Sequence, residues 1–236
     1  MAVAVVSREH LDNISFLTFV TIGKKMRVRD IMSTNVIAVD ENTSIQKARK
    51  IMEAHKIRRL PVMKKDKLVG LVTEHMLLEA WPSSARELSI PELDDLLDKM
   101  NVKEIMVKEP YAISPDIPPE EVLKLGQEMG YGGFPVVEYG RLIGVVTESD
   151  IVRLMTRILG VTKKGKRITI KGSNVFGNMH KIMSILDRNK TVLLSLMSLE
   201  DPEEKEWLIV LRLKNEDVEA IAEELKSVGF NVLYVG

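Results

Sequence analysis

The chain has no cysteine among its 236 residues, which excludes a disulfide framework, a thiolate zinc site and a thiol nucleophile. Histidine is scarce as well. The four histidines are scattered without metal-ligand spacing, so we expect no metal site. Walker-type phosphate loops and nucleophile elbows are also missing. These absences predict a chain that has no catalytic residues and is not an enzyme.

An excess of charge of either sign is absent too. Lys and Arg together number 34, Asp and Glu together number 34, and aromatic residues make up 5%. Nucleic-acid binding generally needs a basic face and stacking aromatics, so we expect no nucleic-acid partner. No apolar run reaches the roughly 18 residues of a membrane span, and no compact signal peptide opens the chain. We therefore expect a cytoplasmic protein with no membrane partner.

Two copies of one pattern occupy the first two thirds of the chain. Residues from Arg29 to about Leu78 align without a gap to residues from Lys103 to Val152, at a constant offset of 74. The identities include a Pro-Val pair and a Val-Thr-Glu triplet in each copy. Because copies of about 50 residues are too small to fold comfortably alone, they should pack against each other.

Each copy has the pattern β-α-β-β-α. A short extended piece precedes a helix, whose start is marked by Thr43 and Gln46 at capping-box spacing in copy one and by Pro118-Pro119 in copy two. A strand, a polar turn and a second strand follow, and Thr73 and Thr147 open the closing helices. The extended pieces and strands lie at 36–39, 60–63 and 68–72 in copy one and at 111–113, 134–137 and 142–146 in copy two.

The sequences RDIMSTNVIAV…HKIRRLPVMKKDKLVGLVTEHML and KEIMVKEPYAI…GYGGFPVVEYGRLIGVVTESDIV resemble CBS domains. The shared marks are a leading Asp/Glu-Ile-Met, a hydrophobic-Pro-Val strand and, complete in copy two, a closing Gly-x-x-Thr-x-x-Asp. The resemblance covers roughly residues 26–159. It implies two domains that pack pseudo-symmetrically and bind adenosyl ligands in clefts between them.

The last third of the chain has a different pattern. Two amphipathic helical patterns, which begin at Met179 and Val218, alternate with four predicted strands. The strands lie at 168–170, 192–197, 207–213 and 230–235. The order β-α-β-β-α-β is the ferredoxin-like arrangement. The position after a CBS pair and the loop KGSNVFGNM resemble an ACT domain, so the fold class is predicted to be α+β.

The expected domain organisation follows from these patterns. The spacer EAWPSSARELSIPELDDLLDKMNVKEIM resembles the insert of bacterial CBS–ACT proteins of the acetoin-utilisation accessory type. Residues 1–25 precede the patterned sequence and are expected to form a poorly ordered extension. The other expected parts are CBS domain 1 at 26–80, a helical spacer at 81–100, CBS domain 2 at 101–160, a linker at 161–166 and an ACT-like domain at 167–236.

The sharpest candidate for a ligand site is an asymmetry between the copies. Copy two closes with Thr147 and Asp150, whereas copy one has Met76 at the position of Asp150. One carboxylate can accept hydrogen bonds from both hydroxyls of a ribose. The resemblance places Asp150 and Thr147 at nucleotide-contacting positions of CBS domains. Ordinary helix capping by the same two residues is the alternative interpretation.

The resemblance also indicates where the adenine base would bind. The positions that usually contact it are occupied by Tyr111, Ala112, Gly133, Phe134 and Pro135. The glycines of this segment are equally consistent with a plain turn between a helix and a strand.

Two arginines, Arg58 and Arg59, stand in copy one where copy two has glycines. Related CBS pairs place basic residues here to reach phosphates across the interface between the copies. Copy one (26–79) carries eleven Lys/Arg against seven Asp/Glu, and copy two (101–159) carries six against nine. A basic half facing a ribose-binding half would suit a phosphorylated adenosine. A solvated basic edge is the alternative.

ACT domains hold an amino acid near the first strand-to-helix loop, where this chain has Asn174, Gly177 and Asn178. Gly177 would let the backbone approach a ligand carboxylate at a helix start. Turn formation and helix capping by these residues are the alternative.

These expectations combine into one functional hypothesis: a regulatory sensor of AMP, ADP or ATP type nucleotides, with an amino acid as a further ligand. Because both domain types pair in related proteins, we expect a homodimer that acts on an unknown regulated protein. The alternatives are a ligand-free module for protein interaction or oligomerisation, or an accessory protein of acetoin catabolism.

Overall fold

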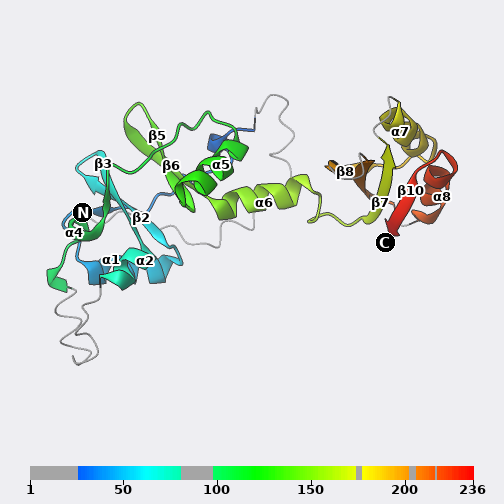
Figure 1. Cartoon of the computed structure of the whole chain (residues 1–236). Helices are drawn as coiled ribbons and strands as arrows, with labels where there is room; N and C mark the ends of the chain where they lie inside the picture. The colour runs from blue at the N-terminus through cyan, green and yellow to red at the C-terminus, as the bar shows by residue number, and fades with distance from the viewer. Residues whose placement is uncertain (1–25, 81–97, 174–176, 202–205, 216) are drawn as a thin grey trace. The chain divides into compact units, whose positions relative to one another are not determined.

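The structure is a computed structural model that describes residues 26–80, 98–173, 177–201, 206–215 and 217–236 (Figure 1). The chain divides into two compact units, one that ends at Ile151 and one that runs from Val152 to Gly236. The first unit holds copy one and copy two up to Ile151. The helical spacer expected at 81–100 lies mostly outside the described residues.

Both copies have the mixed α/β arrangement expected from the repeat, and Figure 1 shows α1 and α2 together on one side of β2 and β3. The extended piece expected at 111–113 is not a strand, because only Ile113 forms an isolated bridge, to Val136. Copy one comprises a 3-10 turn (Val28–Asp30), β1 (Val39–Asp40), α1 (Ile45–His55), β2 (Arg59–Lys64), β3 (Lys67–Thr73) and α2 (Glu74–Glu79). Copy two comprises α4 (Val102–Ile105), β4 (Val107–Lys108), α5 (Pro119–Met129), β5 (Gly133–Glu138), β6 (Arg141–Thr147) and α6 (Glu148–Ile158).

The helices begin and end at residues that suit those positions. Helix α1 is capped by Ser44, whose hydroxyl accepts a hydrogen bond from the Lys47 amide at 3.2 Å. The expected cap at Thr43 is therefore wrong by one residue, because both neighbours are hydroxyl residues with similar preference. Helix α5 has Pro119 in its first turn, as expected, and ends at Gly130 in the left-handed region.

The opening segment of each copy pairs with the other copy. Ser33 bridges to Val145 in β6, and β4 of copy two pairs with Gly70 and Leu71 in β3 of copy one. Backbone bonds repeat this exchange at the offset of 74, since Val28 N donates to Ile117 O and Val102 N donates to Thr43 O. The two copies are therefore joined by a reciprocal, pseudo-two-fold exchange of segments.

Two glycines make room for the exchanged segments. A Cβ on Gly70 would collide with the side chain of Met106, and a Cβ on Gly144 would lie 3.0 Å from Cγ of Met32. Each glycine therefore lets a methionine of the other copy's opening segment lie against its strand. Any larger residue would push the exchanged segment away.

Apolar residues of copy one, together with Val102 from the opening segment of copy two, form the core of copy one, and copy two buries the corresponding positions. Burying such aliphatic side chains contributes roughly 1.5–3 kcal/mol each. The buried core of copy one comprises Val39, Ile45, Ala48, Met52, Leu60, Val62, Val72, Leu77 and Val102. In copy two the buried apolar residues include Ile113, Val122, Phe134, Val136, Val146 and Ile151.

The second unit contains one antiparallel sheet in the strand order β10-β7-β9-β8. Its elements follow the β-α-β-β-α-β order expected from the sequence. They are β7 (Lys166–Ser173), α7 (Asn178–Arg188), β8 (Leu193–Asp201), β9 (Glu206–Leu213), α8 (Glu219–Ser227) and β10 (Asn231–Val235).

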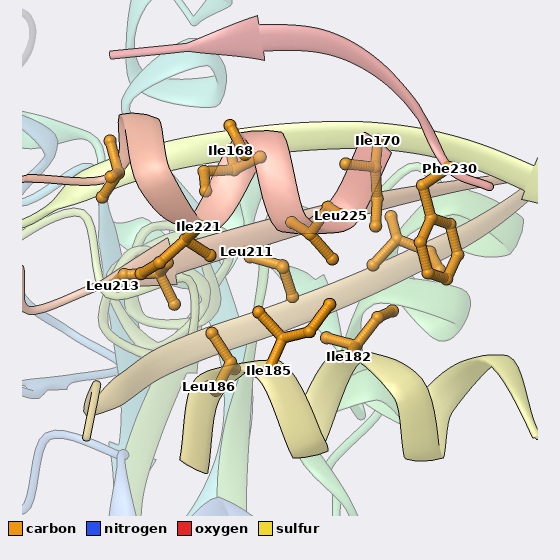
Figure 2. Close-up of a cluster of buried hydrophobic side chains, with 13 residues drawn as sticks. Ile168, Ile170, Ile182, Ile185, Leu186, Leu211, Leu213, Ile221, Leu225 and Phe230 are labelled. Atoms are coloured by element: carbon orange, nitrogen blue, oxygen red, sulfur yellow. The ribbon is translucent and has the colours of Figure 1, made fainter. Parts of the chain in front are cut away.

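The core of the second unit lies between the sheet and its two helices. Figure 2 shows apolar side chains of β7 and β9 pointing toward side chains of α7 and α8. Ile170 and Leu211 from the strands and Ile182 and Leu225 from the helices are fully buried. This core draws only on residues after the repeat, so the second unit has its own apolar interior.

Candidate functional site

Most of the candidate residues lie in or beside the region where β5 and β6 meet the start of α6. Gly133 pairs with Thr147 across the hairpin, and the Glu148 amide donates to the Gly132 carbonyl at 3.2 Å. We call residues 132–133 and 147–150 the copy-two junction. The amide groups of the first helical turn of α6 lie at this junction and carry a partial positive charge.

Asp150 is the buried polar residue of the junction, with 8% of its surface exposed. Its Oδ2 atom accepts hydrogen bonds from the Thr147 amide at 2.9 Å and from the Thr147 hydroxyl at 2.7 Å. The capping contact that was the alternative interpretation is therefore present. It does not exclude a ribose, because a carboxylate offers about four acceptor positions on its two oxygens.

The equivalent helix start in copy one is built differently. The Thr73 hydroxyl accepts a hydrogen bond from the Met76 amide at 3.3 Å. Met76 carries no oxygen that could accept from a ribose hydroxyl. The asymmetry expected from the sequence is thus also an asymmetry of hydrogen bonding.

Three aromatic rings lie beside the junction. The Tyr111 ring meets Phe134 edge-on with centroids 6.1 Å apart, and Tyr131 lies 5.9 Å from the same ring. Phe134 is buried, whereas 47% of the surface of Tyr111 is exposed. Phe134 therefore supports the other rings, and Tyr111 is the ring that a flat ligand can reach.

The other residues expected at the base are held by the backbone of the same region. The Pro135 carbonyl accepts a hydrogen bond from the Ile113 amide at 3.0 Å. Pro135 and Gly133 are buried, while Ala112 is exposed. A Cβ on Gly133 would lie 2.9 Å from the Val146 carbonyl oxygen, so this position accepts only glycine without a backbone shift.

Arg59 crosses from copy one to the junction of copy two. It lies at the start of β2, and its guanidinium occupies the space where a Cβ on Gly132 would stand. Burial and, second, the neighbouring Arg58 lower the pKa of Arg59, whereas Glu148 raises it. Among the described residues, no hydrogen bond or ion pair reaches the Arg59 guanidinium. A partly desolvated cation in this situation attracts an anion.

Arg58 has a different place from its neighbour. It is exposed, and its carbonyl accepts a hydrogen bond from the Glu74 amide at 3.0 Å at the start of α2 in copy one. Of the two candidate arginines, the structure brings Arg59 to the copy-two junction. Arg58 contributes there through its charge.

Two residues of this region were not predicted as site residues. Glu148 lies at the start of α6, with Oε2 3.4 Å from the position of a Cβ on Gly132, and Tyr131 packs on Phe134. The repeated Thr-Glu pair, Thr73-Glu74 and Thr147-Glu148, was a visible signal for Glu148. The sequence could not show that Glu148 lies beside Gly132. Copy one has the same Thr-Glu pair, but it has Arg58 at the position of Gly132.

The loop of the second unit is described only in part, since Asn174 lies outside the described residues. Gly177 precedes α7 with a φ of 93°, in the left-handed region that favours glycine. The Asn178 side chain donates to the Ser173 carbonyl at 2.7 Å, which closes the loop on β7. This bond fits the structural alternative for Asn178.

The described residues contain neither a candidate metal site nor a candidate membrane span. In that part of the chain, no three His, Asp or Glu side chains gather in a way that would hold a metal ion. In the same residues, no helix combines the length and apolar character needed to cross a membrane.

Comparison with known proteins places the repeat in a family. The CBS domain family model matches residues 28–83 and 102–157. A CBS domain-containing protein of Dictyostelium discoideum is 35% identical over 141 residues, which cover 57% of this chain and 94% of that protein. Inosine-5'-monophosphate dehydrogenase of Korarchaeum cryptofilum is 36% identical over 126 residues, but these cover only 23% of the enzyme and 53% of this chain.

Solved structures are also similar to part of this chain. A CBS domain pair solved with 5'-methylthioadenosine and S-adenosyl-L-methionine has 31% identity and a TM-score of 0.46, and covers 58% of this chain and 98% of its own. A Vibrio cholerae protein assigned to acetoin utilization has 26% identity and a TM-score of 0.49, and covers 58% of this chain and 95% of its own.

Proposed function

This chain belongs to the CBS domain family, and on that premise we propose that it is a non-catalytic regulatory sensor of a phosphorylated adenosine such as AMP, ADP or ATP. The ligand binds at the copy-two junction with help from Arg59 of copy one. Its occupancy is transmitted to a regulated protein partner.

The position of Arg59 is the observation that carries this proposal. Its guanidinium is half-buried against Gly132, beside the first turn of α6. Burying a cation without a direct counter-ion is unfavourable, so a phosphate that pairs with it gains more than at an exposed arginine. The amides at the start of α6 favour the same negative charge.

The proposal also assigns groups of the same region to the ribose and the adenine. Asp150 is an anchored carboxylate whose orientation is set by two bonds from Thr147. Tyr111 offers an exposed aromatic face near Ala112, supported from below by Phe134. A charged, a hydrogen-bonding and an apolar group within one region match the three chemical parts of an adenine nucleotide.

An amino-acid site in the second unit is a separate and weaker proposal. The β-α-β-β-α-β order and the glycine start of α7 support an ACT-like domain with a ligand at Gly177 and Asn178. Melting-temperature shifts with each of the common amino acids would test it. A ligand-free interaction module and an accessory role in acetoin catabolism remain the alternatives for the whole chain.

Calorimetric titration of AMP and adenosine into the parent protein and Arg59→Met tests the nucleotide proposal. Losing one charge-assisted hydrogen bond, worth about 1.5–3 kcal/mol, should weaken AMP binding at least about tenfold. Adenosine has no phosphate, so its affinity should change less than about twofold. Arg58→Met is the matched control, and its effect on AMP should be smaller because Arg58 is exposed.

Two outcomes would contradict the proposal. A purified parent protein that binds no adenine nucleotide favours the ligand-free alternative. Equal losses of binding affinity for AMP and adenosine in Arg59→Met would show that the phosphate does not bind at Arg59.

A further inference from the structure

We propose that Glu148 is the internal counter-ion of Arg59 and that an anionic ligand must compete with it. Glu148 then limits how tightly the phosphate binds, because binding replaces an electrostatic attraction between the two copies with a contact to the ligand. The ligand half of this inference rests on the proposed function. The Arg59–Glu148 pair can be tested without any ligand.

The space around Gly132 brings the two charges together. The Arg59 guanidinium and Oε2 of Glu148 both lie within 3.4 Å of the point where a Cβ on Gly132 would stand. The other carboxylate oxygen, Oε1, lies 3.7 Å from the corresponding point on Gly126 in α5. The Glu148 carboxylate thus lies near two glycines, on the side of the junction that Arg59 reaches.

The two side chains attract each other without forming a close pair. The structure records no ion pair within 4.0 Å between them, yet Glu148 opposes the lowering of the Arg59 pKa by burial and by Arg58. Glu148 therefore offsets part of the cost of placing Arg59 here. An attraction at this range, between partly exposed groups, is weak enough for a phosphate to displace.

A phosphate that approaches Arg59 meets both charges. It is attracted by Arg59 and Arg58 and repelled by Glu148. Adenosine carries no charge, so both the attraction and the repulsion are weaker for adenosine than for AMP. Glu148 therefore reduces the advantage of AMP over adenosine that Arg59 provides.

Copy one has no such arrangement and provides the control. Glu74 is the equivalent of Glu148 at the offset of 74, but Met52 and Arg58 replace the two glycines. Glu74 instead borders a shallow depression that Met52 and Leu77 also line. Glu74→Gln therefore makes the same chemical change away from the copy-two junction.

Titrations of AMP and adenosine into the parent, Glu148→Gln and Glu74→Gln proteins test the competition. Glu148→Gln should tighten AMP binding about threefold to fivefold, the size expected for one partly exposed charge interaction. Adenosine affinity and the Glu74→Gln protein should stay within about twofold of the parent. The gain for AMP should shrink when salt screens the charges.

A weaker AMP affinity in Glu148→Gln would overturn the inference, because Glu148 would then contact the ligand favourably. An unchanged AMP affinity would overturn it as well. A parent that binds neither AMP nor adenosine would overturn the proposed function and, with it, the ligand half of this inference.

Urea unfolding of Arg59→Met, Glu148→Gln and the double variant tests the interaction between the two side chains without any ligand. If the two side chains interact, the double variant should lose less stability than both single losses combined, and high salt should reduce that difference. Strictly additive losses at low salt would refute the pair, whatever the nucleotide titrations show.

Discussion

Asp150 has a structural role that does not depend on a ligand. Its Oδ2 atom orients the start of α6 through the amide and hydroxyl of Thr147, at 2.9 and 2.7 Å. Helix capping and the proposed ribose binding would therefore use the same side chain. A single substitution at this residue changes both, so stability and affinity must be measured on the same variant.

The first prediction separates these two roles. Asp150→Ala should cost about 0.5–2 kcal/mol of stability through the lost cap. It should also weaken AMP at least about tenfold, since a hydrogen bond to a charged group is worth about 1.5–3 kcal/mol. Thermal unfolding and calorimetry of the same sample give both numbers. If Asp150→Ala has a lower melting temperature but binds AMP as tightly as the parent does, then Asp150 has only the capping role.

Two further variants control this measurement. Asp150→Asn retains an acceptor for Thr147 but loses the charge, so it should recover stability more than affinity. Met76→Ala changes the equivalent position of copy one and should leave AMP affinity within about twofold, because Met76 offers no acceptor.

At the scale of elements, the exchanged segments are the main feature of the first unit. Arg27 and Arg29 of the opening segment both bind Asp116 of copy two, at 2.6 and 3.0 Å, and Arg29 also binds Glu138 at 2.8 Å. The pseudo-symmetric contact joins Lys103 and Asn42 at 2.9 Å. Ion pairs therefore hold the opening segment of copy one against copy two. In the equivalent contact, the opening segment of copy two donates to the neutral side chain of Asn42.

The second prediction concerns the pH dependence of this contact. Hydrogen bonds from Arg27 and then Arg29 hold the pKa of Asp116 below its ordinary value of 3.8. A depressed pKa contributes stability that is present above the unfolded value and is lost as pH falls through the folded value. Asp116→Asn should therefore be less stable than the parent near neutral pH, and the two should converge below pH 3.8.

Melting temperatures measured from about pH 6 to about pH 2.5 would show this convergence. Asp66→Asn, in the exposed turn between β2 and β3, is the matched control and should track the parent. A constant gap between Asp116→Asn and the parent over the whole range would mean that the Asp116 charge does not stabilise the fold.

At the scale of the whole molecule, the closing helices of both copies expose an aliphatic residue at the same position. Leu78 in α2 and Val152 in α6 differ by the offset of 74 and are 55% and 60% exposed. This equivalent exposure motivates the prediction that a second copy covers these two residues. The homodimer expected from the sequence stays a prediction.

The third prediction is that the protein is a homodimer at micromolar concentration and that Leu78→Glu with Val152→Glu makes it a monomer. Two charges on each covered face would have to be desolvated in the dimer, which is unfavourable. Light scattering after size-exclusion chromatography gives the mass of both proteins. A monomeric parent, or a double variant that stays dimeric, would contradict the assignment of this surface.

Local sequence patterns determined the elements and the symmetry of the chain. Apolar periodicity located the strands and helices of both units, and the offset of 74 predicted two equivalent copies. The periodicity depends on residues a few positions apart, and the offset is found by comparing the sequence with itself. Neither requires the fold. Where two neighbours were equally suited to one role, as Thr43 and Ser44 were for capping α1, the pattern could not choose between them.

Contacts between distant segments were decided only by the tertiary structure. Nothing in the local pattern shows that Ser33 pairs with Val145 or that Glu148 approaches Arg59, because each pair is far apart in the sequence. Such contacts arise when the two copies pack and glycines such as Gly132 leave room for side chains of the other copy. The sequence by itself thus determined what each copy is, whereas packing decided which charges of one copy act on the other.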